Sequence, residues 1–147
     1  MTARDDRANL GHDLSLASRR WRARVDQRLA PFGLTQAKWA PLRHLWRAGG
    51  ALPQHRLAER AGIEGPTLVR VLDELERRGL IKRCDSDADR RSKIVHLTDK
   101  AAPLLDEIAV RLDELREEVL EGVPDEDVAL LHGILARIMQ NLEKADR

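Results

Sequence analysis

Apolar side chains recur at steps of three and four residues along most of this chain, a spacing typical of helices that bury one face. Four long stretches show it, at about residues 8–30, 35–48, 101–121 and 124–142. A proline or glycine interrupts the pattern where each of the first three stretches stops. The pattern therefore predicts four long helices joined by short breaks.

A shorter version of the pattern lies between residues 53 and 79 and is broken by a tight glycine turn. One short helix is expected from Pro53 to Gly62, and another begins near Pro66, a residue that suits the first turn of a helix. Two helices joined by a short turn form a helix-turn-helix. The second helix is expected to face the core with its apolar residues, which are Leu68, Val69, Leu72 and Leu75.

Two short segments after this motif, residues 80–84 and 93–97, are rich in Ile, Val and Leu. A polar, turn-prone segment, residues 85–92, separates them. This arrangement predicts a β-hairpin with a charged tip. A helix-turn-helix followed at once by such a hairpin is a winged helix.

The length of 147 residues leaves room for a second, helical lobe beside the winged helix. The last two helices carry broader apolar faces than one small lobe buries by itself, which favours a homodimer. We therefore expect a mainly α fold with a small β-hairpin, a winged helix-turn-helix with a helical dimerisation lobe. Its segments are residues 1–33 (first dimerisation helix), 34–98 (winged helix-turn-helix) and 99–147 (last dimerisation helices).

Charge is distributed unevenly along the chain. The formal net charge is only +1, but residues 1–51 carry +6, residues 52–97 carry +2 and residues 98–147 carry −7. Of the 26 basic residues 21 are arginines, whose forked guanidinium suits phosphates and carboxylates. Such asymmetry is compatible with one part of the molecule facing a polyanion.

The second helix of the helix-turn-helix is the element that enters the major groove of DNA in this motif. Arg70 on its outer face suits a bidentate contact with guanine. The alternative is an ion pair of Arg70 with Asp73 or Glu74 on a solvated face. The residues expected to meet DNA on this helix are Gly65, Pro66, Thr67, Arg70 and Glu74.

The tip of the expected hairpin carries Asp89, Arg90 and Arg91. An arginine there suits a narrow, A·T-rich minor groove, where the negative potential is strongest. Asp89 is expected to hold the Arg91 side chain extended. A merely solvated charged turn is the alternative.

These segments together resemble the MarR family of bacterial transcriptional regulators, over roughly residues 10–142. The nearest branch is similar to the SlyA-like regulators, whose first helix also carries a Trp-Arg pair like Trp21-Arg22. The segments that carry the resemblance are residues 33–36 with Trp39, 57–63, 68–81 and 89–93.

The resemblance implies a homodimer that binds pseudo-palindromic, A/T-rich double-stranded DNA, with repression as the expected mode and activation or displacement of a silencing protein left open. By position, Pro66, Thr67 and Arg70 match recognition-helix contacts, and Arg91 with Asp89 matches the wing motif. Arg90 stands where relatives often contact the DNA backbone.

The resemblance also implies a small aromatic, anionic effector that binds between the lobes and releases DNA. An arginine beside indole rings suits an aromatic carboxylate. Tryptophans at helical spacing are, however, more often core residues than ligand contacts. The candidate ligand-binding residues are Arg19, Trp21, Trp39, Arg43 and Trp46, with His44 as a further option.

Other classes of function have little support. The five histidines are scattered without metal-binding or catalytic spacing, so no enzyme activity, catalytic residue, metal or cofactor is expected. No apolar run is long enough to span a bilayer and the N-terminus lacks a signal-peptide pattern, so a cytoplasmic protein without membrane partners is expected.

Two alternative functions remain open at this point. A winged helix can mediate protein assembly instead of DNA binding, although Arg90 and Arg91 argue against it. Cys84, the single cysteine, sits between Arg83 and Asp85 and could serve a redox-sensing regulator. A structural thiol is the favoured reading of Cys84.

Overall fold

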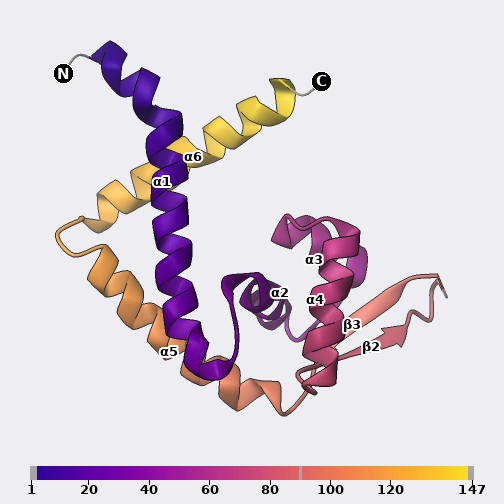
Figure 1. The fold of residues 1–147 in the computed structure, drawn as a ribbon. Helices are drawn as coiled ribbons and strands as arrows, with labels where there is room; N and C mark the ends of the chain where they lie inside the picture. The colour runs from indigo at the N-terminus through magenta and orange to yellow at the C-terminus, as the bar shows by residue number, and fades with distance from the viewer. Residues whose placement is uncertain (1–2, 90, 146–147) are drawn as a thin grey trace. The chain divides into compact units, whose positions relative to one another are not determined.

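The computed structural model describes residues 3–89 and 91–145. Two compact units divide the chain, residues 1–115 and residues 116–147. The elements in chain order are α1 (Ala3–Leu29), the 3-10 turn η1 (Ala30–Phe32), α2 (Gln36–Arg47), β1 (Ala51–Pro53), α3 (Gln54–Ala61), α4 (Gly65–Arg77), β2 (Ile81–Asp85), β3 (Lys93–Leu97), α5 (Ala101–Val119) and α6 (Asp125–Ala145) (Figure 1). The mainly helical winged-helix fold is confirmed.

Local sequence explains where most of these helices begin and end. The α1–η1 segment stops at Gly33, and α3 stops at Gly62, both with positive φ angles of 66° and 62° that glycine adopts at low cost. Pro66 lies in the first turn of α4, where a missing N–H removes no helical hydrogen bond. Pro41 lies inside α2 and is buried.

The sheet has three antiparallel strands in the order β1-β3-β2. The predicted hairpin is present, with Arg83 opposite Val95 and Cys84 opposite Ile94. The third strand, β1, pairs with β3 and places Leu52 opposite Val95. The sequence pattern did not predict this strand. Three residues that end in Pro53 show too little alternation to be recognised as a strand from sequence.

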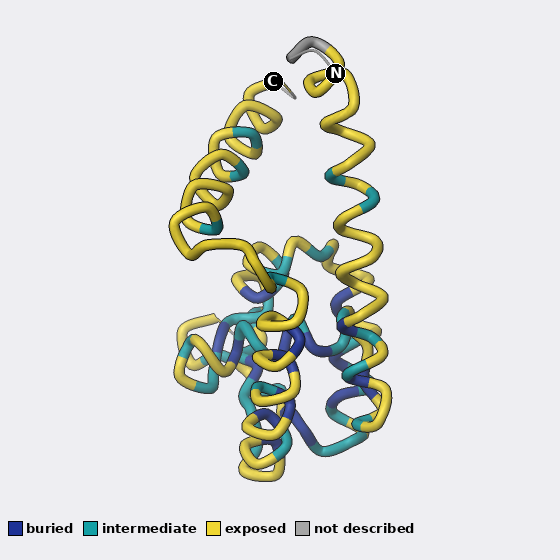
Figure 2. Tube along the Cα trace, turned by 90° about the vertical axis from the view of Figure 1, so that its left-hand side faces the viewer, coloured by how far each residue is buried: buried dark blue, intermediate teal, exposed yellow. Residues whose placement is uncertain are grey.

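A hydrophobic core lies between α2, α3, α4 and the sheet, in the part of the chain that we call the winged lobe (residues 34–98), and it continues onto the last turns of α1 and onto α5 (Figure 2). Leu68, Leu72 and Leu75 on α4 are completely buried. The expectation that Val69 also faces this core is wrong, because its side chain is 37% exposed. The inward face of α4 follows steps of four and three residues, and Val71, half-buried, completes it.

Other apolar positions stay uncovered. Leu10 and Trp21 on α1 are 46% and 37% exposed, although Val25 and Leu29 on the last turns of the same helix are buried. None of the residues of α6 is buried in the described structure. No helix among the described residues is long and apolar enough to cross a membrane.

Candidate nucleic-acid interface

The outer side of α4 presents polar and small side chains to solvent. Pro66, Thr67 and Arg70 are all exposed on the first two turns of this helix. Arg70 forms no ion pair with any described residue, so its guanidinium is available to an external partner. Val69 adds an exposed apolar side chain beside it, a type that suits a thymine methyl group.

The acidic neighbours of Arg70 are bound elsewhere. Lys38 Nζ on α2 donates to Glu74 Oε1 at 2.6 Å, which turns Glu74 toward α2 and away from the exposed face. Asp73 Oδ1 accepts from Arg83 Nη2 on β2 at 2.5 Å. Glu74, expected to meet DNA, is thus paired with Lys38, and the alternative of an Arg70 ion pair with Asp73 or Glu74 is not observed among the described residues.

Arg83 ties the first wing strand to α4. Its Nη2 and Nε donate to Glu76 Oε2 at 2.7 and 3.0 Å, and its backbone N–H donates to Glu76 Oε1 at 3.1 Å. Partial burial disfavours the charge of Arg83, but its hydrogen bonds with Glu76 and Asp73 outweigh this and raise its pKa. The same hydrogen bonds from Arg83 lower the pKa of Glu76, and that from Lys38 lowers the pKa of Glu74.

The wing tip is shaped by Asp89. Its carboxylate Oδ1 accepts from the backbone N–H of Arg91 at 2.9 Å, and its carbonyl accepts from the backbone N–H of Ser92 at 2.9 Å. Asp89 thus fixes the backbone of the turn, whereas the expected contact was with the Arg91 side chain. Arg91 is exposed, and Arg90 lies outside the described residues.

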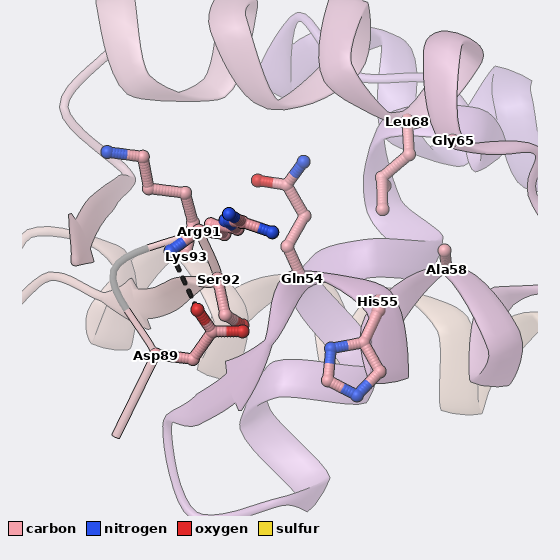
Figure 3. Close-up of a pocket in the computed structure, with 9 residues that line it drawn as sticks. All are labelled: Gln54, His55, Ala58, Gly65, Leu68, Asp89, Arg91, Ser92 and Lys93. Carbon is pink, nitrogen blue, oxygen red and sulfur yellow. Dashed lines mark hydrogen bonds between the residues drawn. The ribbon is translucent and has the colours of Figure 1, made fainter. Parts of the chain in front are cut away.

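A groove of about 460 Å³ separates this wing from the helix-turn-helix (Figure 3). Asp89 and Arg91 line it from the wing, and in Figure 3 the Arg91 side chain extends toward Gln54 of α3. The side-chain oxygen of Gln54 is buried without a hydrogen-bond partner among the described residues. Gly65 and Leu68 at the start of α4 form another wall, so the sequence-predicted wing and recognition helix border one surface.

The candidate effector residues differ in exposure. Trp39 is only 5% exposed and belongs to the core, which is the alternative reading of a helical tryptophan. Trp21 and Trp46 are 37% and 42% exposed. Arg19 donates to Ser15 Oγ at 2.9 Å and lines a hollow of about 350 Å³ on α1 whose described walls contain no residue of α2.

His44 and Cys84 are two further candidate residues in the described structure. Burial, followed by the nearby charges of Arg43, Arg47 and Arg60, lowers the pKa of His44 on α2. Cys84 is a free, half-buried thiol on β2.

The structural contacts of two arginines could not be predicted from the sequence. Arg83 and Arg78 both join elements that are separate along the chain, and nothing in their local sequence distinguishes them from other arginines. Arg78 Nη2 donates to the carbonyl of Phe32, 46 residues away. Only the folded chain shows that Arg78 and Arg83 are internal links.

The exposed helix, the wing and the groove between them define a winged-helix DNA-binding protein of the transcriptional-regulator class. A family model described as MarR family matches residues 32–92. The transcriptional regulator PA3341 is 43% identical, over 92% of this chain and 98% of that one, with a TM-score of 0.82. This chain belongs to the MarR family of transcriptional regulators.

Two other solved structures cover nearly the same length. A MarR-family regulator from Rhodococcus sp. RHA1 is 28% identical, over 94% of this chain and 95% of that one, with a TM-score of 0.81. NadR, solved in complex with 4-hydroxyphenylacetate, is 28% identical, over 88% of this chain and 91% of that one, with a TM-score of 0.76.

Proposed function

We propose that this chain is a homodimeric, sequence-specific DNA-binding regulator. In each copy α4 enters the major groove with Pro66, Thr67 and Arg70, while Arg91 of the wing enters the adjacent minor groove and Arg90 contacts the backbone. The observation that carries this proposal is that Arg91 of the wing and Gly65 at the start of α4 line one groove, on the helix that also carries the exposed Arg70.

The expected operator is pseudo-palindromic and rich in A·T pairs at the positions the wings reach. A bidentate contact of Arg70 with guanine is worth about 1–3 kcal/mol of discrimination against other bases. A narrow A·T minor groove attracts Arg91 through its negative potential and not through base edges. Specificity is thus divided between a base-reading helix and a shape-reading wing.

Exposed apolar side chains on α6 support the homodimer. Leu130, Leu131, Ile134 and Leu142 are 48–63% exposed, more than the exposed large apolar residues of the winged lobe, Trp46 and Val69, at 42% and 37%. An apolar helix face of this size marks an association surface. A dimer would set its two recognition helices about one DNA turn apart, roughly 34–36 Å.

A small aromatic carboxylate is the proposed effector, because NadR binds 4-hydroxyphenylacetate and this chain places exposed Trp21 and Trp46 and the cation Arg19 on α1 and α2. Trp39, in the core, would act by supporting this region, and Arg43 remains a candidate ligand contact. Calorimetric titration with salicylate-like acids tests the proposal. Absence of heat, together with unchanged operator binding, would contradict it.

Further assignments also belong to the proposal. Membership of the SlyA-like branch rests on the Trp21-Arg22 pair, and a cytoplasmic location follows from action on DNA. Redox sensing through Cys84 predicts that Cys84→Ser abolishes peroxide-dependent release of DNA. The favoured structural role predicts no such effect.

Fluorescence anisotropy with duplexes selected by the protein from a random library tests the DNA-binding proposal. We expect binding that weakens steeply with salt. Arg70→Ala should relax preference at one base position by about 1–3 kcal/mol, whereas Arg91→Ala should weaken binding to all sequences. Arg111→Ala on α5, a matched loss of an exposed arginine, should change neither.

Absent or salt-insensitive DNA binding would favour the protein-assembly alternative. Identical behaviour of Arg70→Ala and Arg91→Ala would contradict the division of roles between α4 and the wing.

A further inference from the structure

Arg78, at the end of α4, holds the recognition helix against the end of α1. Its Nη1 donates to the carbonyl of Gly33 at 2.8 Å and its Nη2 donates to the carbonyl of Phe32 at 2.7 Å. The last carbonyls of a helix have no intrahelical donor and carry the negative end of the helix dipole. A guanidinium from α4 therefore caps the C-terminal end of the α1–η1 segment.

The end of α4 is capped in turn by the segment that leads into α5. Lys100 Nζ donates to the carbonyl of Arg78 at 3.0 Å, and Thr98 Oγ1 donates to the carbonyl of Gly79 at 2.6 Å. The C-terminal end of α4 is thus joined by side-chain hydrogen bonds to the segments that border α1 and α5. Its N-terminal end, with the candidate DNA contacts, faces solvent.

Leu68, Leu72 and Leu75 pack α4 into the winged lobe along its length, and Arg78 fixes its C-terminal end beside α1, so α4 tilts relative to α1 only together with the lobe around it. The helix has 13 residues and is about 20 Å long at 1.5 Å per residue. A tilt of about 10° at its fixed end displaces its N-terminus by roughly 3.4 Å, which is one base-pair step of DNA. A forked, two-bond contact restrains such a tilt better than a single hydrogen bond, because it fixes direction as well as distance.

We propose that Arg78 is a positioning residue that sets the half-site spacing accepted by the dimer, by fixing the angle between α4 and α1. The inference rests on the proposed function, in which α1 belongs to the dimerisation lobe and two copies of α4 read one operator. Arg78 itself need not touch DNA. Its loss should leave the reading of one half-site intact and relax the requirement for spacing.

The test measures binding of the full-length protein to the palindrome that the wild type selects from random DNA, and to versions with the half-sites moved apart or together by one or two base pairs. A duplex with a single half-site serves as the reference. The wild type should lose about tenfold or more in affinity at each displaced spacing. Arg78→Gln should bind all spacings within about threefold of one another, with single half-site affinity changed by less than about twofold.

Arg77→Gln is the matched control, because Arg77 is the exposed neighbour whose Nε donates, at 3.3 Å, to the carbonyl of Asp73 in its own helix. Within the described residues, its side chain hydrogen-bonds to no other element. It should keep the wild-type spacing profile. Arg78→Lys retains the charge but not the fork, and should give an intermediate profile. If Arg78→Gln does not fold, the Arg78→Lys profile decides the question.

The outcomes distinguish failure of the proposed function from failure of the role assigned to Arg78. A wild type that is monomeric or binds no duplex contradicts the proposed function. A wild type with a sharp spacing preference that Arg78→Gln and Arg78→Lys both keep overturns the role of Arg78 alone. Equal loss of single half-site and palindrome binding also overturns it, because Arg78 would then support only the reading surface itself.

Discussion

The winged lobe and α6 use apolar residues in opposite ways. In the winged lobe Leu42, Leu57 and Leu72 are completely buried, whereas on α6 Leu130 and Leu142 are 63% and 61% exposed. Both segments show the same helical spacing of apolar positions in the sequence. The comparison shows that periodicity identifies a face to be buried but not whether the partner lies in the same chain.

The largest expected effect concerns the core of the winged lobe. Leu72→Ala should lower the free energy of unfolding by about 2–5 kcal/mol, because a completely buried leucine leaves a cavity. Val69→Ala on the exposed side of the same helix should cost less than about 1 kcal/mol. Urea unfolding measures both. If both substitutions lowered the free energy of unfolding equally, Val69 would have to be a core residue, which would contradict the observed orientation of α4.

A charge on the apolar face of α6 should separate the copies without unfolding the winged lobe. Ile134 is 48% exposed, so Ile134→Glu introduces a carboxylate into the proposed interface. Light scattering should show a monomer, and operator affinity should fall by about a hundredfold because the two half-sites are no longer bound together.

Gln140→Glu adds the same charge at an exposed polar position of α6 and should leave the dimer intact. A dimeric Ile134→Glu variant would show that the α6 face has another role.

The smallest expected effect is a dependence of stability on pH. His44 has a pKa lowered below its ordinary value of 6.5, so the unfolded chain binds a proton that the folded chain resists. Stability should therefore be full above pH 6.5 and fall as the pH drops from there toward the folded-state pKa. His44→Gln should remove this part of the decline in stability, as measured by thermal unfolding at a series of pH values below and above 6.5.

Glu74 and Glu76 add a second decline at lower pH. Lys38 and Arg83 lower their folded-state pKa values below the ordinary 4.5, so the stabilisation is present above pH 4.5 and is lost as the pH falls through the folded-state values. Glu76→Gln should reduce this second decline. An unchanged profile in either variant would show that the corresponding group does not control the transition.

Helix spacing and turn residues were enough to predict the helix-turn-helix and the hairpin, because each depends on residues close together in sequence. They failed at Val69, because the adjacent Leu68 is also apolar and the pattern leaves the edge of the buried face open by one position. Strand β1 was not predicted, because its pairing with β3 is a long-range contact that leaves no local pattern.

The candidate site could be predicted only in part, for the same reason. Arg70 and Arg91 follow from their places in local motifs. The ion pair of Lys38 with Glu74 joins residues 36 positions apart, and no local pattern indicates it. Since such links decide which charges are already paired within the chain, the sequence alone did not reveal that Lys38 engages Glu74.

The start of α2 has a consequence for exchanging parts between relatives. The backbone N–H of Gln36 donates to Asp26 Oδ1 on α1 at 2.6 Å, while the side chain of Thr35, at the N-cap position, makes no capping hydrogen bond. The last two turns of α1 are thus built into the winged lobe. A chimera with its junction at residue 34 would separate this cap from its helix, whereas a junction before Val25 would transplant both together.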